Sequence, residues 1–111
     1  MLKAVREQIH AGSDVIKLMA TGGMMTPRVN PEDAHYTEEE LRIGVNEGHR
    51  FHRTCASHAQ GSEGILNAVR AGMDSIEHGV FMTQECIDAM LEQGTFLVPT
   101  LSAVNGTAPL A

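Results

Sequence analysis

The sequence of 111 residues has little cysteine, few basic residues and no long apolar run, and each shortage excludes a class of protein. The two cysteines, Cys55 and Cys86, are too few and too far apart for a disulfide framework or a thiolate zinc site, so we expect buried free thiols. The sequence has eight Lys and Arg residues and 14 Asp and Glu residues, which gives a formal net charge of -6. It contains no basic run that could follow a nucleic-acid backbone. No segment approaches the ~20 apolar residues of a membrane span, and the N-terminus lacks the apolar core of a secretory signal. These shortages predict a soluble, cytoplasmic protein without a nucleic-acid or membrane partner.

What the sequence does contain is a regular alternation of helical and extended patterns. Hydrophobic residues make up 42% of it, enough for one modest folded domain. The patterns predict helices over 2–10, 37–48, 62–72 and 83–94, separated by strands over 14–20, 53–59, 73–79 and 95–100. Thr37 and Glu40 match a capping box, and Ser62 and Thr83 are predicted N-caps. The tail over 102–111 has no period and is expected to be irregular, so the folded domain is predicted over 1–101.

Strands separated by single helices favour right-handed crossovers and therefore a parallel sheet of the α/β class. The segment AGSDVI over 11–16 recurs as AGMDSI over 71–76, which indicates a wound repeat. A TIM barrel is the commonest fold built from such repeats, but it normally needs ~250 residues. We therefore predict about half of a (β/α)8 barrel. A small flavodoxin-like sheet of four or five strands is the alternative.

Two histidines follow neighbouring predicted strands, where this class of fold carries its chemistry. His58 lies in CASHAQG and His78 in SIEHGV, each before small residues or glycine. Regular alternation places His58 on the face of Thr54 and Ala56, and His78 on the face of Asp74 and Ile76, so both imidazoles can converge on one point. Neutral imidazole is a good zinc ligand, although a histidine at a strand end can also be purely structural.

Lys17, at the end of the first predicted strand, is a third candidate ligand. An ammonium group has no lone pair, so a solvent-facing lysine is one interpretation. In the other, the neutral amine captures CO2 and the resulting carbamate becomes an anionic ligand that can bridge two metals. Lys17 follows its echoed aspartate by three residues and His78 follows its own by four, so strict alternation points them to opposite faces. The second interpretation therefore requires a bulge or an early strand end near Lys17.

The long loop over 24–36 follows the lysine strand, and long loops on the active face of a barrel commonly shape substrate pockets. His35 and Tyr36 end this loop and are candidate substrate-binding residues. The alternative is an exposed polar pair that leads into the helix cap at Thr37.

Several motifs together carry a family resemblance. They are IKLMATGG, HYTEEELRIGVNEGHR, SHAQGSEGILNAVRAGMDSIEHG and GTFLVPTL, in this order up to Leu101. The sequence resembles the metal-dependent amidohydrolase superfamily, within it the imidazolonepropionase-related branch that includes prolidase-like dipeptidases. The resemblance implies strands four to seven of a TIM barrel, with carboxylated Lys17, His58 and His78 as ligands of the more exposed of two divalent metals, for which zinc is the expected ion.

The same resemblance also exposes missing ligands. Members of this family begin with a His-x-His pair on strand one and end with an aspartate on strand eight, and neither can be placed in this sequence. We therefore expect an internal fragment of an enzyme that hydrolyses C–N bonds of small amides or dipeptides by metal-activated water, inactive in isolation. The expected partners are the substrate and either the rest of the barrel or further copies of the chain. The alternative function is a non-catalytic, self-associating half-barrel or a metal-binding remnant.

Overall fold

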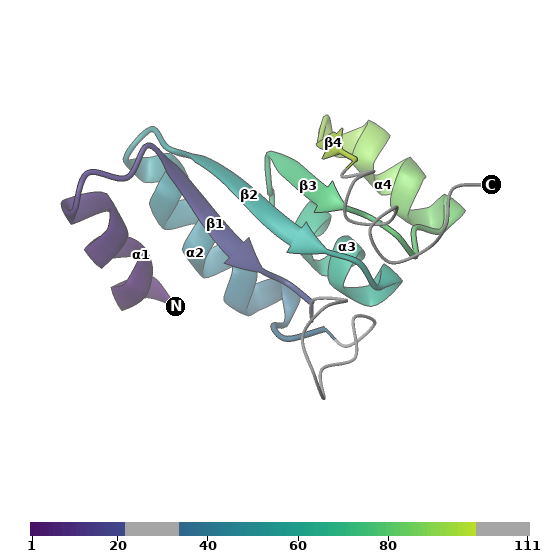
Figure 1. Ribbon diagram of the computed structural model, residues 1–111, viewed down its shortest axis with the longest axis horizontal. Helices are drawn as coiled ribbons and strands as arrows, with labels where there is room; N and C mark the ends of the chain where they lie inside the picture. Colours follow the sequence, from purple (N-terminus) through teal and green to yellow (C-terminus); the bar gives the residue numbers. More distant parts are fainter. Residues whose placement is uncertain (22–33, 100–111) are drawn as a thin grey trace, which may run out of the picture.

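The computed structural model describes residues 1–21 and 34–99, in which helices and strands alternate along the chain (Figure 1). The strands form one four-stranded sheet in the order β1-β2-β3-β4, and every neighbouring pair is parallel. The elements are α1 (Leu2–His10), β1 (Val15–Met19), α2 (Glu38–Arg50), β2 (Thr54–Ala59), α3 (Ser62–Arg70), β3 (Ser75–His78), α4 (Gln84–Gln93) and β4 (Phe96–Val98). The α/β class and the parallel sheet expected from the sequence are confirmed.

The helices cover one face of the sheet, and Figure 1 shows α2 and α3 behind the strands. Ile16, Cys55 and Ile76 point from three strands into the same core, and none of them is more than 3% exposed. Leu41 and Val45 of α2 meet this core together with further helical residues, namely Val5, Ile65, Ala68, Val69, Cys86 and Met90. A single apolar layer between helices and sheet therefore holds the described fold together.

The opposite face of the sheet carries exposed apolar side chains. Val15 and Met19 of β1 are 51% and 44% exposed, and Phe96 and Val98 of β4 are 75% and 46% exposed. Strands that run in sequential order, with helices on one face in the described residues, match a segment of a barrel wall. A flavodoxin-like sheet would instead reverse its strand order and carry helices on both faces. The partial barrel is therefore the architecture that the structure supports.

Helix ends agree with the sequence prediction at two of three predicted caps. Thr37 and Glu40 form the reciprocal capping box, and the Thr83 hydroxyl accepts the backbone N–H of Cys86 at 3.3 Å. The third prediction was wrong by one residue, because the N-cap of α3 is Gly61 and Ser62 is already helical. The predicted tail over 102–111 lies outside the described residues, as does most of the long loop.

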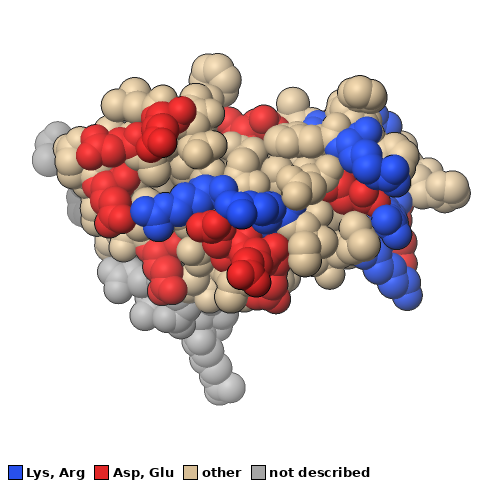
Figure 2. All heavy atoms as spheres, turned by 180° about the vertical axis from the view of Figure 1, so that it is seen from behind, with Lys and Arg blue, Asp and Glu red and all other residues tan. Residues whose placement is uncertain are grey.

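Charged side chains of both signs lie side by side on the helix-covered surface (Figure 2). They pair across and along the helices, as Arg42 does with Glu38 at 2.7 Å and Arg70 with Glu85 at 3.0 Å. Within the described residues, none of the helices combines the length and apolarity needed to cross a bilayer.

One carboxylate of this surface is almost fully buried. Glu47 of α2 is 6% exposed, and it accepts hydrogen bonds from Arg6 of α1 and, at 2.9 Å, from Arg50. The hydrogen bond from Arg6 is the main cause that lowers the pKa of Glu47 below its ordinary value of 4.5; burial opposes the shift and Arg50 adds to it. This arrangement fastens α1 to α2.

The charge on Glu47 is therefore expected to make stability depend on pH. A carboxylate with a lowered pKa stabilises the fold above its unfolded pKa, and this contribution is lost as the pH falls through the lowered value. We expect Glu47→Gln to be less stable than the unchanged chain at neutral pH, with the difference shrinking as the pH falls below the ordinary value of 4.5. Urea unfolding over a series of pH values measures this. Glu85→Gln is the control, because Glu85 is 66% exposed and its pair with Arg70 is expected to contribute little. A constant difference for Glu47→Gln at all pH values would contradict the prediction.

Candidate metal centre

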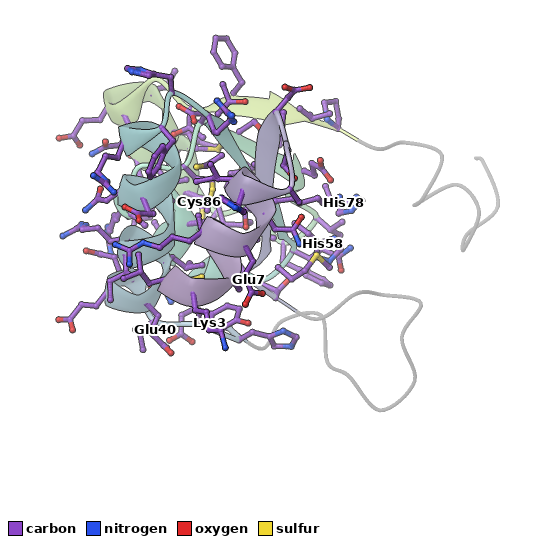
Figure 3. The ribbon with its side chains drawn as sticks, turned by 90° about the vertical axis from the view of Figure 1, so that its left-hand side faces the viewer. Lys3, Glu7, Glu40, His58, His78 and Cys86 are labelled. Carbon is purple, nitrogen blue, oxygen red and sulfur yellow. The ribbon has the colours of Figure 1, made fainter. Side chains whose placement is uncertain are left out.

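Two imidazoles meet at the carboxyl ends of β2 and β3. The ring centroids of His58 and His78 lie 4.4 Å apart, with the rings edge to face at 73°. Figure 3 shows both side chains pointing to the same side of the molecule, away from the helices that cover the other face of the sheet. The convergence of these two side chains, which the sequence predicted, is present in the structure.

The local reason for this convergence differs from the predicted one. Ser57 is paired with Ile76 and His58 with Glu77, so Ile76 points into the buried core and not to the face of His58. By alternation His78 would follow Ile76 to the helix side. Its backbone instead adopts a φ of +76°, in the left-handed region, and this ends the alternation and lets the imidazole turn to His58. The irregularity therefore lies at His78.

No bulge is needed at Lys17. Strand β1 is paired regularly with β2 from Val15 to Met19, and Lys17 lies opposite Ala56 on the face that carries His58. The Lys17 Nζ reaches across β2 and lies 2.7 Å from Oε2 of Glu77, with the lysine 52% and the glutamate 24% exposed. The small side chain of Ala56, which lies beside Lys17 on β2, leaves room for the lysine to reach Glu77.

Glu77 is a residue of this site that the sequence prediction missed. The repeated segment contains the signal that could have found it, since Lys17 and Glu77 each follow their echoed aspartate, Asp14 or Asp74, by three residues. Equal spacing in two equivalent strands predicts the same face, and the ion pair between them shows that they share it.

Burial and charge act together on the imidazoles. His58 is 7% exposed. Burial lowers the pKa of His78, the charges of His58 and Lys17 lower it further, and only Glu77 acts in the opposite direction. A lowered pKa keeps His78 neutral at physiological pH, which is the form of imidazole that binds a metal.

His35 and Tyr36 lie at the same end of the sheet. The His35 N–H donates to the carbonyl of Ala20 at 2.8 Å, and the Ala20 N–H in turn donates to the carbonyl of His58 at 2.9 Å. The carbonyl of Tyr36 accepts a hydrogen bond from Asn67 of α3 at 3.2 Å, and its side chain is 37% exposed. Their role in substrate binding stays a prediction.

The donor set fits one divalent cation. Two imidazoles from adjacent strands can supply two ligands, and a tetrahedral ion such as zinc then has positions left for a third protein ligand and water. Lys17 cannot be that ligand while it is an ammonium group paired with Glu77. It becomes a candidate once the ion pair opens and the amine is converted to an anion.

Known proteins are similar to this chain in sequence and in backbone structure. Residues 2–108 match the model of the Amidohydrolase family. Ochratoxinase of Aspergillus niger is 40% identical over 103 residues, which are 93% of this chain and 22% of that protein. A crystal structure of a Xaa-Pro dipeptidase with bound methionine in the active site is 40% identical, with a TM-score of 0.93, over 96% of this chain and 26% of that one. A prolidase complexed with N-methylphosphonate-L-proline is 36% identical, with a TM-score of 0.86, over 96% and 27%.

These matches extend over nearly the whole chain and over much less of each relative. The chain spans about a quarter of the length of the curated relatives it matches. Its backbone superimposes on about a quarter of each of these larger chains, which agrees with a partial barrel. On the match over 2–108 and the 40% identity to ochratoxinase, this chain belongs to the amidohydrolase family.

Proposed function

We propose that the chain supplies one half of the metal centre of a zinc-dependent amidohydrolase that cleaves C–N bonds of small amides or dipeptides. The observation that carries this proposal is the pair of imidazoles 4.4 Å apart at the ends of β2 and β3. His58 and His78 would each hold the metal through one ring nitrogen. When bound, such a metal lowers the pKa of water from 15.7 to about 7 and so supplies hydroxide at neutral pH.

Lys17 is the proposed third ligand, as a carbamate. The ion pair with Glu77 must first open, and Lys17 must lose a proton to solvent. The neutral amine nitrogen then forms a bond to the carbon of CO2, an electron pair moves to one oxygen, and a second proton leaves the nitrogen. The product carries the negative charge and the oxygen atoms that a divalent metal prefers. Glu77, released from the lysine, stays on the same face of the sheet.

The substrate class is proposed from the relatives. One of them is named a Xaa-Pro dipeptidase, a name that specifies a dipeptide as the substrate of that protein, and another is named a prolidase. We extend the same class of C–N bond to this chain as part of a whole enzyme. The sequence contains no His-x-His pair, so we propose that the chain alone binds metal without completing hydrolysis. The cytoplasmic location stays a prediction.

The open face of the sheet favours a second candidate, a self-associating half-barrel. Val15, Met19, Phe96 and Val98 expose apolar surface there, and parallel sheets are normally covered on both faces. A second copy or the rest of a barrel would each cover it. Sedimentation distinguishes them, because a compact monomer at all concentrations would exclude the self-associating form.

The decisive test of the proposed site uses its lysine. The sequence has only two lysines, Lys3 and Lys17, so Lys3→Gln leaves Lys17 as the single lysine. With 13C-labelled bicarbonate and Zn2+, we expect a carbamate carbon signal in the NMR spectrum of Lys3→Gln. Adding Lys17→Arg to this variant is expected to remove the signal. A signal that persists after both replacements would come from the N-terminal amine, and would refute Lys17 as the ligand.

A further inference from the structure

A second group of metal-ligating side chains gathers at the opposite end of the sheet. His49 lies in the last turn of α2, Cys55 is the second residue of β2, and Asp74 directly precedes β3. Their ligand atoms all lie within 4.8 Å of one another. Among the described residues, this is the one group of three potential metal ligands that lie so close together. The proposed function assigns no role to it.

Hydrogen bonds already hold this group in place. The Asp74 Oδ2 accepts the backbone N–H of Cys55 at 2.7 Å and lies 2.7 Å from the His49 Nε2. The carboxylate is thereby fixed between the imidazole and the start of β2. The side chains of His49 and Asp74 are 40% and 42% exposed, whereas Cys55 is completely buried. A cation could therefore arrive from solvent at two ligands and meet the third at the edge of the core.

Gly48 shapes the space around the sulfur. A Cβ at this position would lie 2.7 Å from the Cys55 Sγ, so any side chain there would displace the thiol. Glycine lets the sulfur lie against the end of α2, one residue from His49. The approach of helix and strand thus places the thiol beside the imidazole.

We propose that His49, Cys55 and Asp74 form a binding site for a divalent cation of the zinc class, with water as the fourth ligand. A thiolate, an imidazole and a carboxylate are the three donor types found in zinc sites, and three protein ligands with one open position form a common zinc geometry. On binding, the thiol proton leaves to solvent, and the contact between His49 and Asp74 is replaced by one bond from each to the metal. The sulfur ligand selects against Mg2+ and Ca2+.

Without a bound metal, the Cys55 thiol has low reactivity. Burial raises the pKa of the Cys55 thiol to about 11, and the neighbouring charge of Asp74 adds to this shift. Cys55 is therefore protonated at neutral pH, and reactions that need a free thiolate are slow. A bound cation would ionise the thiol by direct coordination, which makes thiolate absorption a specific sign of binding at this site.

The test is a Cd2+ titration of the chain carrying His58→Ala and His78→Ala, followed by the ultraviolet absorption of the cadmium–thiolate bond. We expect thiolate absorption that saturates at one equivalent of Cd2+. Adding Cys55→Ser should remove the absorption and weaken binding, measured by calorimetry, at least about tenfold. Cys86→Ser is the matched control, because Cys86 is also buried but is not part of the cluster.

A second variant tests the imidazole without disturbing the core. His49→Gln changes an exposed side chain and should weaken Cd2+ binding while circular dichroism stays unchanged. If the chain with His58→Ala and His78→Ala does not fold, the titration is carried out on the chain without these two replacements. Cys55→Ser should then lower the number of bound Cd2+ ions by one. The proposal is overturned if Cd2+ produces no thiolate absorption, or if Cys55→Ser retains it. These outcomes are independent of the proposed function, since the two ligand sets share no residue.

Discussion

Replacing both His58 and His78 by alanine is expected to lower the Zn2+ affinity of the site at the carboxyl ends of β2 and β3 by more than about a hundredfold. Mutating a group that only orients a metal ligand already lowers metal affinity by about 10–100-fold, and these two residues are the ligands themselves. The double variant removes both imidazoles of the pair, whose rings lie 4.4 Å apart. Each single replacement is expected to have nearly the same effect, since one imidazole leaves too few ligands to hold the ion. Calorimetric titration with Zn2+ in the presence of bicarbonate measures the loss.

Every chain in this comparison also carries Cys55→Ser, so that Zn2+ binding by His49, Cys55 and Asp74 at the other end of the sheet does not contribute. His10→Ala is the matched control, since His10 is an exposed histidine in the last turn of α1. Its affinity for Zn2+ should equal that of the parent chain. Undiminished binding after loss of both His58 and His78, in a chain that circular dichroism shows to be folded, would rule out the strand-end site.

Gly64→Ala is expected to destabilise the fold by about 1–3 kcal/mol, the usual cost of overpacking a core. A Cβ at Gly64 of α3 would lie 2.1 Å from the Thr21 Cγ2 and 3.3 Å from the carbonyl oxygen of Ala20. The methyl group is the main obstacle, and Thr21→Ser removes it while keeping the hydroxyl that accepts the Gln60 N–H at 2.9 Å. The double variant with Thr21→Ser should therefore recover most of the lost stability. A double-mutant cycle of urea unfolding measures this coupling.

Gly44→Ala in α2 is the matched control for a glycine inside a helix. A Cβ there would lie 2.9 Å from the Met1 Sδ and 3.2 Å from the Leu18 Cδ1, and both are outer atoms of flexible side chains that can shift. Alanine also favours a helix over glycine by roughly 1 kcal/mol. We expect Gly44→Ala to be neutral or stabilising. Equal effects at both glycines, or no rescue by Thr21→Ser, would show that the contact with Thr21 does not limit the packing of α3.

The sequence predicted the order and the parallel arrangement of the elements, because local signals repeat at regular intervals. Three helix ends are set by local chemistry. Thr37 forms a reciprocal capping box, Thr83 caps its helix with its side chain, and Gly94 adopts the left-handed conformation of a C-cap. The cap of α3 was predicted one residue late, at Ser62. Gly61 caps that helix without a side-chain hydrogen bond, so the sequence carries no polar signal for it.

The site was predictable only in part. His58 follows from position on a regular strand, and Glu77 could have been found from the echo of Lys17. His78 could not be placed correctly by alternation, because a φ of +76° at a residue other than glycine reflects the tertiary setting of the strand end. The cluster of His49, Cys55 and Asp74 draws on three separate elements, and no spacing in the sequence joins them.

The left-handed backbone at His78 also restricts which amino acids this position can accept. Besides glycine, the residues that tolerate such a φ best are asparagine, aspartate and histidine, while a β-branched side chain is strongly disfavoured. All three carry a nitrogen or oxygen lone pair that can bind a metal. Among residues that carry a side chain, the backbone conformation and the proposed coordination therefore favour the same types at position 78. Glycine, the one residue that fits this φ without a side chain, would keep the backbone conformation of the strand end and remove the donor atom.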